Sequence, residues 1–135
     1  MKDQYFGDVN DFRKYGLLRA LTMRDGLHVG VCWMLTEPDG RTDGSFLSYL
    51  DQPKKYRASD PQLFDWLYHV VRTQRDRRTA YIEASGKLGN AKFLSVLLRD
   101  AAADRNTYFS ECRALLADCG RSKRSRNRPA HGLLR

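Results

Sequence analysis

Hydrophobic positions near the start of the chain recur with the period of an α-helix. Apolar side chains fall at every third residue between positions 11 and 23, which predicts a helix there with one buried stripe. Arg13 and Lys14 lie off this stripe, and Asp8 or Asn10 is placed to cap the first turn. Gly26 follows as a typical end signal. The stripe consists of Phe12, Tyr15, Leu18 and Leu21, widened by Leu17.

The next apolar run is continuous instead of periodic. Residues 27–35, LHVGVCWML, have the length and composition of a strand that is buried on both faces, as in a parallel sheet. A polar, turn-rich loop, TEPDGRTDGS, follows at 36–45, and we expect a short helical piece over 46–50.

A second strongly periodic segment, SDPQLFDWLYHVVR, predicts a helix over 59–72. Ser59 or Asp60 is the expected cap, and Pro61 suits the first helical turn because its missing N–H has no partner there. The expected buried face comprises Leu63, Trp66 or Leu67, and Val70.

The remaining segments predict an alternation of helices and strands. We expect TAYIEA at 79–84 to be a second strand, NAKFLSVLLRD at 90–100 a helix, and 105–118 a further helix. Such alternation favours an α/β fold with a Rossmann-like parallel sheet and flanking helices. Two strands are too few to bury both sheet faces, so we expect an incomplete sheet. The predicted units are an α/β domain at 1–118 and a basic, disordered tail at 119–135.

The net charge of +8 is concentrated at one end of the chain. Residues 121–135 hold six basic residues and no acid, and without them 18 basic residues face 16 acidic ones. A basic tail of this kind either binds phosphate backbones without sequence preference or is a solvated end.

The composition also indicates a compartment. The three cysteines have no CxxC spacing, and the first residues lack the apolar core of a signal peptide. No apolar run has membrane-spanning length. We therefore expect reduced thiols, a cytoplasmic location and no membrane partner.

Two segments carry a resemblance to a known family. Residues 5–19, YFGDVNDFRKYGLLR, and 60–65, DPQLFD, resemble the YxGDxxDYxKYGLLR-like and DPxLFD segments of a family of uncharacterised bacterial proteins. The likeness covers residues 4–117 and extends more loosely to three-Cys-motif partner proteins. It implies a Rossmann-type α/β fold and no particular reaction. Members continue into a strand with an FFDPDNG-like acidic turn, which this sequence lacks, so the chain resembles a C-terminally truncated or frame-shifted member.

Candidate chemistry follows the first predicted strand, because ligands of open α/β sheets bind beyond the carboxyl ends of the strands. Asp39 and Asp43 are candidate catalytic acids and Mg²⁺ ligands there. Thr36 and Arg41 are candidate ligand-binding residues of the same loop. The alternative is a solvated turn.

A second candidate group lies near the first residues. Asp8 is a site acid or a helix cap, and Arg13 and Lys14 are candidate ligand-binding residues. If the first helix packs beside the sheet, the segment YFGD closes over the same strand-end edge. Tyr5 and Phe6 are then its buried anchors.

Glu83, at the end of the second predicted strand, completes the candidate catalytic acids, with a plain helix-entry turn as the alternative. These acids favour a metal-dependent enzyme, with Mg²⁺, that acts on nucleic acid or a nucleotide. The basic run at 72–78 favours the same function. The alternative is a non-catalytic remnant or a basic nucleic-acid-binding module.

Overall fold

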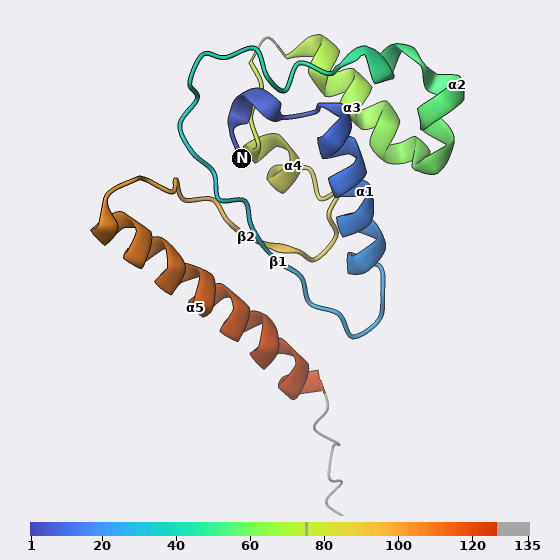
Figure 1. The fold of residues 1–135 in the computed structure, drawn as a ribbon. Helices are drawn as coiled ribbons and strands as arrows, with labels where there is room; N and C mark the ends of the chain where they lie inside the picture. Colours follow the sequence, from blue (N-terminus) through green and yellow to red (C-terminus); the bar gives the residue numbers. More distant parts are fainter. Residues whose placement is uncertain (75, 127–135) are drawn as a thin grey trace, which may run out of the picture.

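Helices surround a small parallel sheet in the computed structural model, which describes residues 1–74 and 76–126, with side chains up to Arg121 (Figure 1). This combination places the chain in the α/β class. The main elements are α1 (Val9–Thr22), β1 (Gly30–Cys32), α2 (Pro53–Tyr56), α3 (Pro61–Thr73), α4 (Ala80–Ala84), β2 (Lys92–Leu94) and α5 (Ala102–Arg126). The 3-10 turns are η1 (Asp3–Tyr5), η2 (Ser48–Asp51) and η3 (Arg57–Ser59).

The two strands pair in parallel, with Val31 of β1 opposite Phe93 of β2. One further parallel bridge joins Leu35 to Leu97, beyond the carboxyl ends of both strands. The strand predicted over 27–35 is therefore confirmed in type and direction, and it is shorter than expected. Its pairing partner lies about 60 residues away in the chain, as parallel pairing through a crossover requires.

Helices cover both faces of this sheet. Trp33 points to the α1 side, where its ring lies 5.9 Å from that of Tyr15. Gly30 points to the α5 side, where an added Cβ would lie 3.3 Å from the Cys119 sulfur. Figure 1 shows α5 alone on its side of the sheet and the other helices on the opposite side. Two covered faces are what a parallel sheet requires.

The two strongly periodic helices are confirmed. Phe12 and Tyr15 of α1 are buried, whereas Leu17 is 63% exposed and does not widen the stripe as predicted. In α3 the Asp60 side chain accepts a hydrogen bond from the Leu63 amide at 3.0 Å, which settles the choice of cap. The buried face of α3 comprises Leu63, Phe64 and Leu67.

Two predicted segments have the opposite secondary structure. Residues 79–84 were expected to be a strand and form α4, and residues 90–100 were expected to be a helix and contain β2. A segment as short as TAYIEA at 79–84 does not distinguish helix from strand. Around 92–94, pairing with β1 and the stacking of Phe93 on Trp33, with ring centres 6.2 Å apart, outweigh local helix propensity.

The last helix is longer than predicted. The expected helix over 105–118 extends as α5 to Arg126, so the first part of the predicted tail at 119–135 is helical. The rest of that predicted tail, 127–135, lies outside the described residues.

Candidate functional site

The first residues of the chain lie across the carboxyl end of β1. The Met1 nitrogen donates to the Met34 carbonyl at 2.9 Å, and the Thr36 amide donates to the Met1 carbonyl at 2.8 Å. Phe6 is 1% exposed, and its ring packs edge-on against Trp66 at 6.2 Å. The N-terminal segment therefore lies over the strand-end edge as predicted, although Met1 makes these contacts with the strand end. Of the two expected anchors, Phe6 is buried and Tyr5 is only half-buried.

Two glycines make this closure sterically possible. Gly7 has φ +77°, and a Cβ there would lie 2.6 Å from the Val71 side chain. Gly44 has φ +79°, and a Cβ there would overlap the Tyr5 ring and lie 2.9 Å from the Tyr5 Cα. Both positions need the left-handed backbone that glycine adopts without strain, and both leave no room for a side chain.

Met34 joins this closure to the far side of the sheet. It has φ +51°, which is uncommon for a residue other than glycine. Its amide donates to the Tyr108 hydroxyl of α5 at 2.8 Å, while its carbonyl accepts from Met1. One strained residue therefore contacts both α5 and the N-terminal segment.

A cavity of about 330 Å³ opens between the N-terminal segment, the start of α1 and the loop at 43–46. It brings together three of the predicted site residues, Asp8, Lys14 and Asp43. We call it the N-terminal pocket. Its lining comprises Met1, Tyr5, Asp8, Asn10, Asp11, Lys14, Asp43, Gly44 and Phe46.

Asp11 is the most strongly bound carboxylate of this pocket. It is 2% exposed and accepts hydrogen bonds from the Gly7 amide at 3.1 Å and the Tyr15 hydroxyl at 2.8 Å. Lys14 Nζ lies 2.7 Å from its other oxygen. Burial, and then the Asp11 charge, raise the pKa of Tyr15 far above its ordinary value. Tyr15 therefore remains a proton donor to Asp11, which Lys14 also contacts.

Asp8 both caps α1 and lines the pocket. Its Oδ1 accepts from the amides of Asn10 and Asp11, both at 2.9 Å, so the expected cap role is present. The hydrogen bonds found among the described residues use Oδ1 alone. Burial raises the pKa of Asp8 above its ordinary value, and the Asp11 charge adds to this effect, against the two amide bonds.

The basic run at 72–78 contains one base that is internal. Arg77 turns inward, and its Nε donates to the Phe6 carbonyl at 2.6 Å. Its Nη2 is buried without a partner in the described part of the chain. Arg72 pairs with Asp51, and Arg78 pairs with Asp76. Sequence reasoning missed the internal role of Arg77 because its neighbours are exposed bases.

The two predicted Mg²⁺ ligands, Asp39 and Asp43, interact with different partners. Asp39 pairs with Lys2 at 2.8 Å, and this contact lowers the pKa of Asp39 to about 2. Asp43 lies 3.6 Å from Arg41 and 3.5 Å from the Tyr5 hydroxyl. No group of three or more acidic, histidine or cysteine side chains able to hold a metal occurs among the described residues. The residues present do not fit a Mg²⁺ ion held by Asp39 and Asp43.

Two other predicted residues stabilise the structure around the site. The Thr36 hydroxyl donates to the Met1 carbonyl at 3.3 Å. Glu83 lies on α4, not at a strand end as predicted, and accepts from Trp33 Nε1 at 2.7 Å and Ser95 Oγ at 2.6 Å. Glu83 thus joins α4 to the segments that follow β1 and β2, and it is not among the residues that line the N-terminal pocket.

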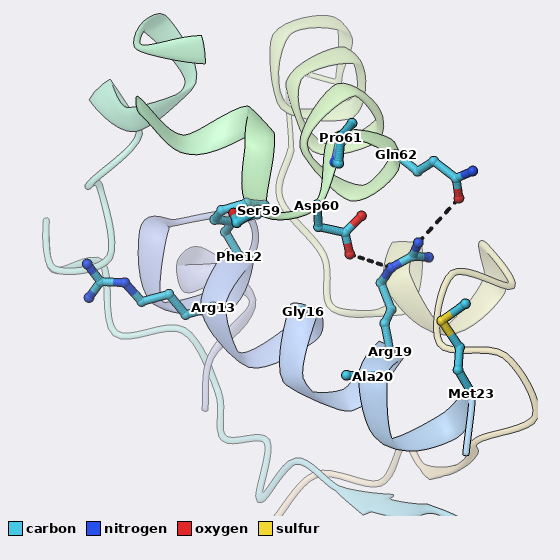
Figure 2. A pocket seen from close by; sticks show the side chains of 10 residues that line it. All are labelled: Phe12, Arg13, Gly16, Arg19, Ala20, Met23, Ser59, Asp60, Pro61 and Gln62. Carbon is cyan, nitrogen blue, oxygen red and sulfur yellow. Dashed lines mark hydrogen bonds and ion pairs between the residues drawn. The ribbon is translucent and has the colours of Figure 1, made fainter. Parts of the chain in front are cut away.

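A larger groove of about 820 Å³ separates α1 from the start of α3 (Figure 2). Arg13, a predicted ligand-binding residue, lines this groove instead of the N-terminal pocket and points away from its centre in Figure 2. Arg19 donates to Asp60 at 2.7 Å, to Lys87 O at 2.9 Å and to Gln62 at 3.3 Å. The bonds from Arg19 to Asp60 and Gln62 therefore tie α1 to the start of α3.

Comparison with protein-family models, with curated proteins and with solved structures gives no match to this chain. Within the described residues, none of the helices combines the length and the apolar character needed to cross a bilayer.

Proposed function

We propose that this chain is the nucleotide-binding N-terminal part of an enzyme with a Rossmann-like fold. The observation that carries the proposal is the N-terminal pocket, which gathers Asp8, Lys14 and Asp43 beside the carboxyl end of β1. In open α/β sheets this end of the strands is where ligands bind. The parallel pairing of β1 with β2 and the helices on both sheet faces support the Rossmann-like part of the proposal.

The pocket chemistry matches the two kinds of group on a nucleotide. Asp8 and Asp43 offer acceptors for sugar hydroxyls or base amino groups, and Asn10 adds an amide. Lys14 offers a cation for a phosphate, with Arg41 next to the pocket residue Asp43. A volume of about 330 Å³ is at the small end of ligand cavities, which suits a mononucleotide better than a larger cofactor.

Asp8 is the proposed general base. Its buried carboxyl group has a raised pKa, which brings it closer to neutrality, where a base is most effective. Asn10 and Asp11 fix Oδ1, so Oδ2 is the oxygen that takes the substrate proton. Asp8→Asn keeps a capping oxygen, and we expect it to retain the fold and nucleotide binding.

Isothermal titration calorimetry with ADP, adenosine and inorganic phosphate tests the binding. We expect Lys14→Met to weaken ADP binding at least about tenfold and to change adenosine binding little, because hydrogen bonds to charged groups contribute about 1.5–3 kcal/mol. Lys54→Met, an exposed lysine of α2 remote from the pocket, is the matched control. Circular dichroism checks that each variant is folded.

Two outcomes would contradict the proposal. One is that the unaltered chain binds none of the three ligands. The other is that Lys14→Met and Lys54→Met weaken ADP binding equally, which would mean that the nucleotide does not bind in the N-terminal pocket.

A basic nucleic-acid-binding module is the second candidate, because α5 continues through RSKRSR at 121–126. Fluorescence anisotropy with a single-stranded oligonucleotide tests it. If this segment binds phosphates, replacing its four basic residues by glutamine lowers the slope of log affinity against log salt by about 0.7 for each phosphate that is no longer neutralised. An unchanged slope would contradict this second function.

A further inference from the structure

The three cysteines, which lie far apart in the sequence, gather between β1 and α5. Cys119 of α5 lies over Gly30, where an added Cβ would be 3.3 Å from its sulfur. Cys112 lies close enough to Cys32 to raise the pKa of the Cys32 thiol. Gly30 and Cys32 share one face of β1 because they are two residues apart. All three thiols are free in the structure.

Three pairs of neighbouring residues show that α5 runs antiparallel to β1 and the residues that follow it. Tyr108 meets Met34, Cys112 meets Cys32, and Cys119 meets Gly30. As the residue number rises along α5, the number of its partner falls along β1. The Cys32–Cys112 contact therefore belongs to a regular alignment of helix and strand, which holds the two sulfurs in place.

We propose that Cys32 and Cys112 are a modification site, a dithiol that a hydroperoxide oxidises to a disulfide that fastens α5 to β1. The thiolate of one cysteine attacks the outer peroxide oxygen, the O–O bond breaks, and the alkoxide takes a proton and leaves as the alcohol. The sulfur of the other cysteine then attacks this sulfenic acid, and the S–O bond breaks. The released hydroxide takes the proton of the second thiol and leaves as water.

Cys119 is an internal control for geometry. It lies seven residues after Cys112 on the same helix, a rise of about 10.5 Å, which exceeds the Cα separation that a disulfide allows. Cys119 also lies over Gly30, which is two residues before Cys32 on the same face of β1. The alignment therefore favours one pair out of the three possible ones.

A covalent tie would change the behaviour of α5. Of its side chains from Ala102 to Arg121, Tyr108 and Cys119 are the buried ones, while Phe109 is 44% and Leu116 is 58% exposed. A helix held through so narrow a face opens easily, and its amides exchange with solvent through such openings. The disulfide would suppress those openings.

The experiment treats the full chain and Cys119→Ser with tert-butyl hydroperoxide, followed by thiol titration and non-reducing peptide mapping. Both proteins are expected to lose two thiols and to yield one crosslink, between the peptides that contain Cys32 and Cys112. Cys32→Ser and Cys112→Ser should form no intramolecular crosslink. Hydrogen exchange in α5 should slow on oxidation and recover with dithiothreitol.

Three results would overturn the proposal. The first is that all three thiols of the full chain survive the treatment. The second is a crosslink that includes Cys119, and the third is a set of crosslinks only between molecules. Peptide mapping of the unaltered chain separates these outcomes without reliance on any variant.

Discussion

Replacement of Gly44 by alanine tests whether the N-terminal segment packs on the loop as described. Gly44 has φ +79°, and alanine in a left-handed backbone costs about 1–2 kcal/mol. The new Cβ would also lie 2.9 Å from the Tyr5 Cα. Because that atom is backbone, the conflict is not relieved by a rotamer change, and overpacking adds about 1–3 kcal/mol. We expect Gly44→Ala to lower the free energy of unfolding by about 2–5 kcal/mol.

Gly40 provides a matched control in the same loop. It has φ +70°, and an added Cβ there would meet no atom within 4 Å, so Gly40→Ala keeps the backbone penalty and lacks the collision. We expect it to cost about 1–2 kcal/mol. Urea unfolding followed by the fluorescence of Trp33 and Trp66 measures both variants. Equal losses of stability in the two variants would refute the packing of Tyr5 against Gly44.

Three further changes test other parts of the structure. Asp8 stabilises the folded state fully below its ordinary pKa of 3.8, and this contribution is lost as the pH rises through its raised folded pKa. Asp8→Asn should therefore gain stability relative to the unaltered chain with rising pH in urea titrations, and a constant difference would contradict the raised pKa. Tyr15→Phe removes the hydroxyl donor of buried Asp11 and should cost about 1–3 kcal/mol in the same assay, whereas no loss would mean that Asp11 finds another donor. Leu67→Ala, at a fully buried position of α3, should cost about 2–5 kcal/mol, and a loss below about 1 kcal/mol would show that the core there is loosely packed.

Local sequence signals predict the helices α1 and α3 correctly, but they do not predict β2, the second strand of the sheet. Asp8, Asp60 and Pro61 mark helix starts through contacts with their own neighbours, so the sequence predicts both helices. β2 is three residues long, and its partner β1 lies far away in the chain. No local pattern encodes such a pairing, and a short apolar run fits either helix or strand. The predictions for 79–84 and 90–100 were wrong for this reason.

The candidate site was predictable in part. The N-terminal motif and the loop after β1 led to Asp8, Lys14 and Asp43, which line one pocket. The ion pair of Asp39 with Lys2 was not predictable, because it depends on the N-terminal segment crossing the loop. Arg77 was also missed, since nothing in a run of bases shows which one turns inward.

The position of Met34 has a thermodynamic consequence. Its amide donates a hydrogen bond to Tyr108 of α5. Its carbonyl accepts one from Met1, a residue of the N-terminal pocket. The backbone of Met34 therefore connects α5 with the N-terminal pocket. If a ligand shifts the backbone of Met34, it changes the opening equilibrium of α5. Linkage then requires the reverse effect to be equally large, so a change that fixes α5 would alter ligand affinity by the same factor. A single strained residue would set the size of that reciprocal coupling.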